Sequence, residues 1–548
     1  MNQYDYIIVG SGPGGSVMAN RLSEDGTKSV LVIEAGRSDD SWLIHMPKGI
    51  GKLLTGSPYV NYYKTKQDNV GREHMWVRGK TVGGSSSVNG MVYSRGQPED
   101  YDNWESLGAS GWNWNTIKNA FRKIENHVLG EDELRGIGGG MHITMHKPDS
   151  KLSEVILETS EACGTPAKDD VNREDQVGLG HAPEMIRGGR RWSVAKAFLR
   201  PALSRRNVAL VTSTSVRRVL FEGKRAFGVE CDGPSGRIVY LARAEVVLCA
   251  GAFESPKILM LSGIGPAAHL AEKGVELLHD SPNVGQNLQE HYGLSLAFRL
   301  KNGASLNKQF SGWRLYRNVL QYILSHRGLM ASGVHELMGF AKTDSQSTAA
   351  DTQLFITPMS RVPDKALVFE KKSGISCLIY PGRPTTTGTV RLSSADPSLA
   401  PEIEYNALTT PYDQRIAISM VHYVRRLFAT KPLSDFIDHE TVPGPSIKTD
   451  DQILDCVRRT GSWGYHTCGT VRMGDQDDAP LDTMMRVRGV KGLRVVDASS
   501  FPAIVSANTT APVAAMAWFL CDRMKAEIPV KEHAKPQAEH SVTAASLK

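Results

Sequence analysis

The first forty residues alternate between short apolar runs and stretches rich in glycine or polar residues. Residues 6–9 form one β-branched apolar run, and residues 29–33 form a second, which ends at Glu34. Glycines crowd the start of the segment between the runs, and its residues 16–22 have a helix-compatible composition. Short apolar runs bounded by glycine are typical of buried strands. The pattern therefore predicts a strand–helix–strand unit of an α/β fold.

The turn that opens this helix carries Gly10, Gly12 and Gly15 in G-x-G-x-x-G spacing. The first glycine permits a tight turn, the second admits a pyrophosphate, and the third lets the helix pack close to the strand. The helix N-terminus offers free N–H groups to the phosphates. Glu34 stands near the place of an acid that binds a ribose hydroxyl, which favours FAD or NAD over NADP. The alternative is a glycine-rich turn in another kind of βαβ protein.

Two loop-rich segments follow. Residues 37–75 combine loop-forming and aromatic residues and are interpreted either as a lid over the cofactor or as a surface loop stiffened by aromatics. Residues 78–91 crowd glycines, serines and an asparagine together, which gives a backbone rich in donors. Apolar residues in and around this stretch favour a second cofactor-contacting loop over a flexible linker.

The middle of the chain changes character twice. Residues 112–128 predict a helix. Short strands with turn signals between them are predicted at 208–212, 215–221, 226–229, 238–242 and 244–248. Small residues then lead into a predicted helix at 256–261. Beyond residue 298, helices near 312–326 and 413–428 flank candidate strands at 353–358, 375–380 and 388–392, which is typical of an α+β module.

Length and charge limit the function classes. A chain of 548 residues exceeds one ordinary domain. The formal net charge of +6 comes from 64 basic and 58 acidic residues that are mixed along the chain, so there is no basic block that would indicate nucleic acid. The seven cysteines are odd in number and lack C-x-x-C spacing, which favours reduced thiols over a disulfide framework or a zinc site. No residues have metal-ligand spacing, so no metal is expected.

The pattern at the start of the chain and its apolar runs predict the location. The chain enters its first predicted strand almost at once, which leaves no room for a signal peptide. Its apolar runs stay below the roughly 18 residues that span a bilayer. We therefore expect a cytoplasmic protein without a transmembrane segment, and peripheral membrane contact stays open.

Taken together, the motifs resemble the glucose–methanol–choline (GMC) family of FAD-dependent alcohol oxidoreductases over residues 4–525. The blocks that carry the resemblance are GSGPGGS with Glu34, GKTVGGSSSVNGMVYSRG at 79–96, GAFESPKILMLSGIG at 251–265, GYHTCGTVRMG at 464–474 and GLRVVDASSFPAIVSANTTAP at 492–512. Within the family the chain looks most like choline-dehydrogenase-like bacterial members.

The resemblance implies a fold and a domain order. The fold is α/β, with a Rossmann-like FAD-binding domain and an inserted substrate domain of antiparallel sheet plus helices. The expected order is an FAD-binding part at 1–150, a connecting or substrate-domain segment at 151–204, FAD-binding residues 205–297, the substrate domain at 298–465, a third FAD-binding part at 466–528, and a disordered tail at 529–548.

The resemblance also implies site residues. His466 matches the catalytic histidine, and Asn508 matches the second catalytic position. The implied cofactor-binding residues are Gly10, Gly12, Gly15, Glu34, Gly83, Gly84, Ser87, Asn89, Gly90, Met91, Val216, Asp497, Ala498, Thr509 and Thr510. The position at which some members attach FAD covalently through histidine is Val88 here, which has no nucleophile, so the resemblance implies non-covalent FAD.

The expected activity is FAD-dependent oxidation of a primary alcohol, aryl or otherwise uncharged, to the aldehyde, with His466 as the base. Histidine suits this role because its ordinary pKa is near 6.5. The partners are an alcohol and an electron acceptor, which could be oxygen, a quinone or a dye. The alternatives are a choline-dehydrogenase-type reaction and a non-redox, hydroxynitrile-lyase-like reaction. Glu336 could receive a cationic substrate, and Phe310, Trp313 and Tyr316 could line its pocket, although surface charge and core packing are the simpler interpretations. His291, among other histidines, is expected to be structural.

Overall fold

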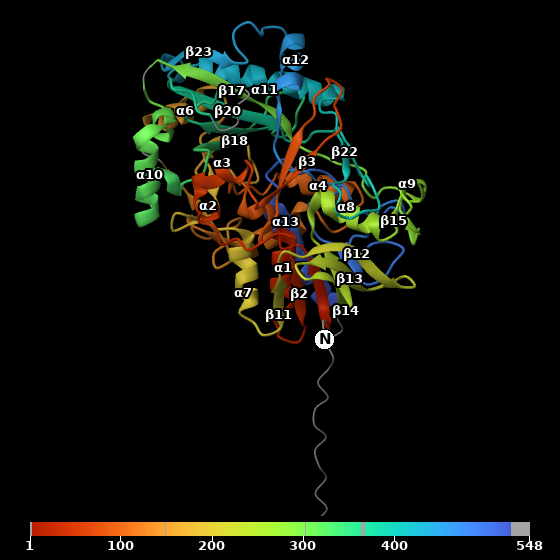
Figure 1. Ribbon diagram of the computed structural model, residues 1–548. Helices are drawn as coiled ribbons and strands as arrows, with labels where there is room; N and C mark the ends of the chain where they lie inside the picture. The colour runs from red at the N-terminus through yellow and green to blue at the C-terminus, as the bar shows by residue number, and fades with distance from the viewer. Residues whose placement is uncertain (1–2, 148–149, 302, 363–367, 528–548) are drawn as a thin grey trace, which may run out of the picture.

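Two β-sheets organise the molecule (Figure 1). The computed structural model describes residues 3–147, 150–301, 303–362 and 368–527 of the chain. A parallel sheet with its helices forms the lower half of Figure 1, and an antiparallel sheet with its helices forms the upper half. The tail predicted at 529–548 lies outside the described residues. The predicted fold class, α/β with an α+β module, is confirmed.

The lower sheet is parallel at its centre and has an antiparallel extension on one side. Its strands, in order, are β11 (Val208–Val211), β2 (Val30–Ile33), β1 (Gln3–Val9), β14 (Gly236–Leu248), β13 (Arg225–Gly233) and β12 (Ser215–Glu222), and β25 (Leu493–Val495) pairs with β14. Helix α1 (Pro13–Leu22) connects β1 to β2 and packs against α13 (Thr510–Glu527). The first and last elements of the chain therefore share one apolar core.

The upper sheet is antiparallel. Its strands, in order, are β18 (Leu337–Ala341), β19 (Thr352–Thr357), β20 (Gly374–Pro381), β17 (Tyr292–Leu300) and β23 (Ile437–Val442), and β24 (Ser462–Trp463) pairs with β17. Alternate residues such as Leu354 and Ile379 belong to the core that α11 (Pro411–Ala429) also enters. Gln353, Phe355 and Tyr380 alternate with them along the strands, so they lie on the opposite face of the sheet.

The remaining elements connect and cover the two sheets. They are α2 (Trp42–His45), η1 (Pro47–Gly49), α3 (Ile50–Leu53), β3 (Val60–Lys64), β4 (Met75–Gly79), η2 (Gly84–Ser87), α4 (Pro98–Ser106), α5 (Trp114–Ile124), β5 (Glu125–His127), β6 (Met141–Met145), α6 (Lys151–Ala162), β7 (Gly178–His181), β8 (Pro183–Glu184), β9 (Ile186–Arg187), β10 (Arg190–Arg191), η3 (Ala195–Leu199), α7 (Arg200–Leu203), α8 (Gly251–Leu261), β15 (Ile264–Gly265), α9 (Ala267–Glu272), β16 (His279–Asp280), η4 (Asn307–Phe310), α10 (Gly312–Ser325), η5 (Leu329–Ala331), β21 (Thr389–Arg391), β22 (Glu402–Glu404), η6 (Leu433–Asp435), α12 (Asp450–Thr460) and η7 (Ala498–Ser500). Among the helices of the described residues, none is long and apolar enough to cross a membrane.

Several predicted elements have different bounds. The helix predicted at 112–128 is shorter: Asn113 caps its start by accepting the Thr116 N–H, and Glu125 leaves it to begin strand β5. The strands predicted at 238–242 and 244–248 form one strand, β14. Helix α8 begins at Gly251 rather than at 256, because Asp497 accepts the Gly251 N–H at 2.8 Å.

The predicted domain boundaries stay proposals, and two elements bear on them. Strand β17 runs through the proposed boundary between residues 297 and 298, so the antiparallel sheet begins earlier in the chain, at Tyr292. Helix α6 contributes Leu152, Val155 and Ile156 to the core of the upper half. The segment that starts at residue 151 therefore packs with the antiparallel sheet.

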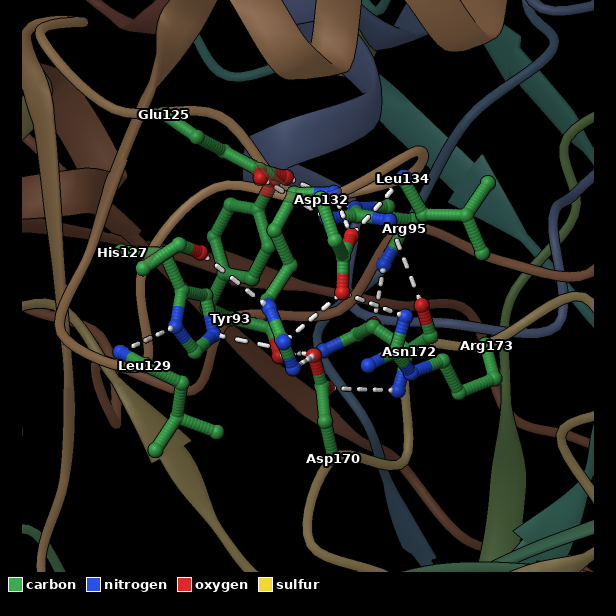
Figure 2. Close-up of polar contacts among 12 residues, drawn as sticks. Tyr93, Arg95, Glu125, His127, Leu129, Asp132, Leu134, Asp170, Asn172 and Arg173 are labelled. Carbon is green, nitrogen blue, oxygen red and sulfur yellow. Dashed lines mark hydrogen bonds and ion pairs between the residues drawn. The ribbon is translucent and has the colours of Figure 1, made fainter.

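A buried ionic network fastens the residues that follow the second glycine-rich loop (Figure 2). The guanidinium of Arg95 makes two contacts of 2.7 Å with the carboxylate of Glu125, and the Tyr93 hydroxyl donates to the same carboxylate. The side-chain oxygen of Asn172 accepts the Arg95 backbone N–H at 3.0 Å. Two parallel charge-assisted bonds are the strongest arrangement for such a pair, so the network fixes where the loop ends.

We expect the loss of one partner in this network to be costly. Glu125→Gln should lower the free energy of unfolding by about 3–5 kcal/mol, because Arg95 would stay buried and unpaired. The double variant Arg95→Met/Glu125→Leu should lose less. The exposed pair between Arg459 and Asp455 gives the control, since Asp455→Asn should cost less than about 1 kcal/mol. Urea unfolding followed by tryptophan fluorescence measures the free energy of unfolding of all three variants. Equal losses for Glu125→Gln and Asp455→Asn would contradict the prediction.

Candidate active site

The first glycine-rich loop lies where β1 ends and α1 begins. Gly10 has a φ of +100°, and a Cβ there would lie 2.4 Å from the Cys249 carbonyl oxygen. A Cβ on Gly15 would lie 1.9 Å from the Gly10 oxygen, so helix and strand could not pack this closely with any other residue. A Cβ on Gly12 would have no protein atom nearer than 4.0 Å. No side chain caps the helix N-terminus at Gly12, as a phosphate-binding turn requires.

Glu34 ties this loop to the end of β2. One carboxylate oxygen accepts the Ser11 N–H at 3.1 Å and the Ser11 hydroxyl at 2.5 Å, and the other accepts the Gly36 N–H at 2.8 Å. The Glu34 carbonyl accepts the Thr214 N–H, which brings the start of β12, and with it Val216, close to the loop. The contacts of Glu34 with a ribose and of Val216 with adenine stay predictions.

The second glycine-rich loop packs directly on the first. The Gly83 N–H donates to the Ser11 hydroxyl at 3.1 Å, and a Cβ on Gly84 would lie 3.0 Å from the Gly12 Cα. Ser87 is buried and donates to the Val82 carbonyl at 2.7 Å. The two loops therefore form one surface.

The same loop reaches the start of α13. Asn89 Nδ2 donates to the Thr510 hydroxyl at 3.2 Å, and Asn89 Oδ1 accepts the Met91 N–H at 3.0 Å. Arg191 Nη1 donates to the Asn89 backbone carbonyl at 2.7 Å and to Asn89 Oδ1 at 2.8 Å. Burial lowers the pKa of Arg191 to about 9. A Cβ on Gly90 would meet no protein atom within 4 Å, so this part of the loop also faces open space.

Val88 lies on the apolar side of this loop. It is buried in a cluster with Ile44, Leu53 and Val60 from the segment predicted as a lid or a stiffened loop. That segment forms α2, α3 and the hairpin of β3 and β4, and it packs against the loop. The interpretation of this segment as a lid over the cofactor stays a prediction.

Asp497 joins the C-terminal segment to the lower sheet. One carboxylate oxygen accepts the Gly251 N–H and the Ser255 hydroxyl, at 2.8 and 2.6 Å, and the other accepts the Ser499 N–H at 2.8 Å. The Ala498 carbonyl accepts the Gly469 N–H at 3.0 Å. Thr509 lies one residue before α13 and its carbonyl accepts the Val513 N–H. The predicted cofactor residues near 497 and 509 thus lie at the ends of η7 and α13.

The two predicted catalytic residues meet, although 42 positions separate them in the chain. Asn508 Nδ2 lies 2.9 Å from His466 Nε2. Asn508 Oδ1 accepts from Gln353 Nε2 at 3.3 Å. Gln353 Oε1 is buried and has no hydrogen-bond partner among the described residues, which leaves an acceptor beside Asn508.

A second histidine, His291, contacts the other side of the His466 ring. The two Nδ1 atoms lie 2.8 Å apart, and His291 Nε2 lies 3.0 Å from the Gly382 carbonyl oxygen. His291 stacks on Tyr380, with ring centroids 5.1 Å apart and an interplanar angle of 6°. Burial lowers the pKa of His291 to about 4. Burial, and then His291 and Arg78, hold the pKa of His466 well below its ordinary value.

Glu290 holds the backbone of both histidines. Its Oε1 accepts the His466 N–H at 2.6 Å and the His291 N–H at 2.9 Å, and its Oε2 accepts from Trp76 Nε1 at 3.1 Å. Burial raises the pKa of Glu290 to about 7, and Arg78, 3.9 Å away, opposes that shift. Glu290 thereby fixes the backbone positions of His291 and His466 relative to each other.

An aromatic wall leads away from His466 along the upper sheet. Tyr380 meets His466 edge to face at 5.8 Å, Phe355 lies 5.9 Å from Tyr380, and His335 lies 4.7 Å from Phe355. Burial, followed by the positive charges of Arg361 and Lys48, lowers the pKa of His335 to about 3. This wall is aromatic, its histidines are neutral, and the Tyr380 hydroxyl is hydrogen-bonded to Asn508.

The residues suggested for a cationic substrate have other contacts. The Glu336 carboxylate accepts the Ser153 hydroxyl at 2.8 Å. Burial raises the pKa of Glu336, and the Ser153 hydrogen bond and the positive charge of Lys48 oppose that shift. Trp313 and Tyr316 lie exposed on α10, so their suggested place in the pocket is wrong. Phe310 packs against the ring of Phe369.

Sequence reasoning missed His291, Glu290, Gln353 and Tyr380. His291 was expected to be an ordinary structural histidine, and it lies 175 positions from His466. The chain offers one weak signal, the adjacent acid and histidine at 290 and 291 within the polar stretch before a strand. Neither spacing nor composition links that pair to His466, because the two segments meet only in the folded chain, through the pairing of β17 with β24 and the bridge between Gln289 and Cys468.

These features define a class of protein. Two glycine-rich loops in contact, an uncapped helix N-terminus and open space at Gly90 fit a bound dinucleotide, and a histidine and an asparagine meet nearby. The family model for GMC oxidoreductase matches residues 4–293 with its N-terminal part and residues 384–517 with its C-terminal part. The chain belongs to the GMC oxidoreductases and is an FAD-dependent enzyme, as its motifs predicted.

Relatives agree with this assignment. The oxygen-dependent choline dehydrogenase of Brucella canis is 37% identical over 513 residues, which cover 93% of each protein. The crystal structure of pyridoxine 4-oxidase from Mesorbium loti is similar, with a TM-score of 0.86, 30% identity and coverage of 96% of this chain and 99% of that one. A formate oxidase structure has a TM-score of 0.89 at 27% identity, covering 96% of this chain and 98% of that one.

The environment of Val88 predicts how FAD is held. Because an apolar side chain occupies the attachment position, all the flavin should be released into the supernatant when the purified yellow protein is precipitated with acid. Mass spectrometry of the supernatant should identify FAD rather than FMN. Flavin that stays in the washed pellet would show a covalent bond and contradict the prediction.

Proposed function

We propose that the protein oxidises an uncharged primary alcohol, aryl alcohols included, to the aldehyde, with His466 as the base. The observation that carries this proposal is the one-way chain of hydrogen bonds that passes through His466. Bound FAD would supply the hydride acceptor, beside Asn89, Met91 and Thr509. The chain's own groups hold the alcohol and take its proton.

The direction of the hydrogen bonds supports an unprotonated Nε2 on His466. The Gly382 carbonyl can only accept, so His291 Nε2 carries a proton and donates to it. In a neutral His291, Nδ1 is then an acceptor, and the bond at 2.8 Å requires a proton on His466 Nδ1. His466 Nε2 is therefore unprotonated. This is the atom that faces Asn508.

Electrostatics support the same state. Both histidines have lowered pKa values, so both are neutral near pH 7. At His466 Nε2, the lone pair accepts the amide N–H of Asn508 at 2.9 Å. An alcohol hydroxyl that takes the place of this amide N–H at Nε2 can give its proton to His466, while the Asn508 side chain shifts to donate to the alcohol oxygen and the hydride leaves the carbon. A non-titrating amide holds the oxygen without competing for the proton.

The surroundings support an uncharged substrate. The aromatic wall of Phe355 and Tyr380 suits an apolar or aryl group. The positive charge of Arg78 acts on His466, and those of Arg78 and Arg361 act on Tyr465, which lies one residue before it. The acid beside them, Glu290, lies 3.9 Å from Arg78 and accepts the backbone N–H groups of both histidines, so it is already engaged and a cationic substrate is disfavoured. Relatives named choline dehydrogenase support choline as the alternative. The acid suggested for a cationic substrate, Glu336, already accepts the Ser153 hydroxyl and interacts with the positive charge of Lys48, which argues against choline.

The remaining parts of the proposal concern acceptor and location. The electron acceptor is oxygen, a quinone or a dye, and the relatives named oxygen-dependent favour oxygen. We propose a cytoplasmic location, because all seven cysteines are free thiols, as expected for a reducing compartment.

The role of His466 predicts a large kinetic effect. His466→Ala should slow anaerobic flavin reduction by alcohol about 10²-fold or more at full FAD content, because a positioned base is lost. Asn508→Ala should slow it by only about 2- to 10-fold, as expected for one neutral hydrogen bond. Stopped-flow absorbance measures both rates. Near-normal reduction by His466→Ala would refute the proposed role, and flavin that stays oxidised in the wild type would favour the lyase alternative.

The same experiment, repeated against pH, separates His466 from its support. Since the pKa of His466 is lowered, the rate should persist down to pH values below 6.5 and fall only as His466 gains a proton. The alanine variant should lack this acidic limb. A limb near pH 7 in both proteins would belong to Glu290.

His291 provides a matched pair of variants for the same chain. His291→Phe keeps the stack on Tyr380 but removes the acceptor for His466 Nδ1, so flavin reduction should slow by about tenfold or more. His291→Asn keeps an acceptor at that place and should stay within about threefold of wild type. Nitrogen NMR of the imidazoles, assigned with His466→Ala, should show the proton of His466 on Nδ1 in the wild type. A proton on Nε2 would contradict the tautomer.

A substrate comparison tests the proposed charge preference. At equal concentration, benzyl alcohol should reduce the flavin faster than choline, because the site has an aromatic wall and positive neighbours but no free acid at Glu336. Anaerobic absorbance changes at the flavin band give both rates. Faster reduction by choline would overturn the ranking and support the choline alternative.

A further inference from the structure

Helix α10 carries an exposed apolar stripe. Trp313, Tyr316, Leu320, Ile323 and Leu324 recur at spacings of three, four, three and one residues, which places them on one side of the helix. All five are more than half exposed, and Tyr316 and Leu324 are 78% and 77% exposed. Figure 1 shows α10 at the left edge of the molecule, with no labelled element beyond it. A stripe of this size is unusual on a surface that meets only water.

The other side of the helix is anchored. Asn318 and Tyr322 are buried, Tyr322 packs in a cluster with Met46 and Met330, and its hydroxyl donates to the His45 carbonyl at 3.1 Å. Asn318 Nδ2 donates to the Gln309 carbonyl at 3.1 Å. The apolar stripe is therefore held in place on the surface by contacts with the folded protein.

The segment that contains the stripe carries charge of one sign. Residues 301–335 contain no aspartate or glutamate, and their basic residues are Lys301, Lys308, Arg314, Arg317 and Arg327. Arg314 and Arg317 lie over the ring of Trp313, at 5.7 and 5.2 Å from its centroid. The stripe is thus bordered by positive charge that has no acidic residue near it in sequence.

We propose that α10 is a membrane-surface helix and that its occupant is a lipid bilayer with anionic headgroups. Apolar side chains with tryptophan on one side and arginines beside them are the composition of helices that lie in the bilayer interface. A second copy of the chain fits less well, because pairing two such helices would bring their arginines together without an acid to balance them. The proposal is independent of the reaction assigned to His466.

Vesicle sedimentation tests the proposal with the full-length, FAD-loaded protein. Wild type should bind vesicles of equimolar phosphatidylcholine and phosphatidylglycerol, and bind pure phosphatidylcholine more weakly. Leu320→Glu/Leu324→Glu should weaken binding by about 100-fold, since it removes apolar burial and adds repulsion. Arg314→Gln/Arg317→Gln should weaken it by about tenfold or more and reduce its salt dependence.

The matched control adds the same charge elsewhere. Leu277→Glu/Leu399→Glu changes two exposed leucines outside α10, and it should bind vesicles nearly as well as wild type. All variants should keep their flavin spectrum. Absence of wild-type binding, or equal loss in the control and in the α10 variants, would overturn the proposal. So would a dimer, detected by sedimentation velocity, that depends on Leu320 and Leu324 and forms without vesicle binding.

Discussion

The carbonyl oxygen of Gly382 can accept a hydrogen bond and cannot donate one, and the chemistry of the site depends on that fact. It orients His291, and His291 orients His466. The bonds from Gln353 through Asn508 to His466 run in the same direction. A chain of donors that ends on a backbone carbonyl has only one low-energy arrangement while both rings are neutral. The backbone at the end of β20 thereby decides which nitrogen of His466 is unprotonated.

The two sheets contribute different things to this arrangement. His291 lies just before β17, Gln353 belongs to β19 and Gly382 follows β20, so the upper sheet supplies the hydrogen bonds that orient the imidazole. The lower sheet supplies the glycine-rich loops and the start of α13, beside which Asn508 lies. His466 itself follows β24, which is paired to β17. The site therefore exists only where the two halves of the molecule meet, and burial there keeps both histidines neutral.

The sequence predicted what depends on local pattern. The spacing of Gly10 and Gly15 predicts their steric roles. The strand–helix–strand unit around them has bounds close to those expected. His466 and Asn508 came from the resemblance to a family, not from periodicity. Their supports could not be predicted, because Glu290 and His291 act through contacts 175 or more positions away that only the folded chain creates. The early start of α8 and the early end of α5 have the same cause, since Asp497 and Glu125 are held by partners distant in sequence.

The helix at the surface and the loop at the cofactor site are linked by one short segment. Met46 packs in the cluster under α10, Ile44 packs in the cluster around Val88, and Leu43 contacts both clusters. Arg191 adds a polar link, because it donates to the Ile44 carbonyl at 2.9 Å and to Asn89 at 2.7 Å. Close packing transmits small displacements between such neighbours. A bilayer under α10 would therefore be separated from the cofactor loop by little more than the segment that was first predicted as a lid or a stiffened loop.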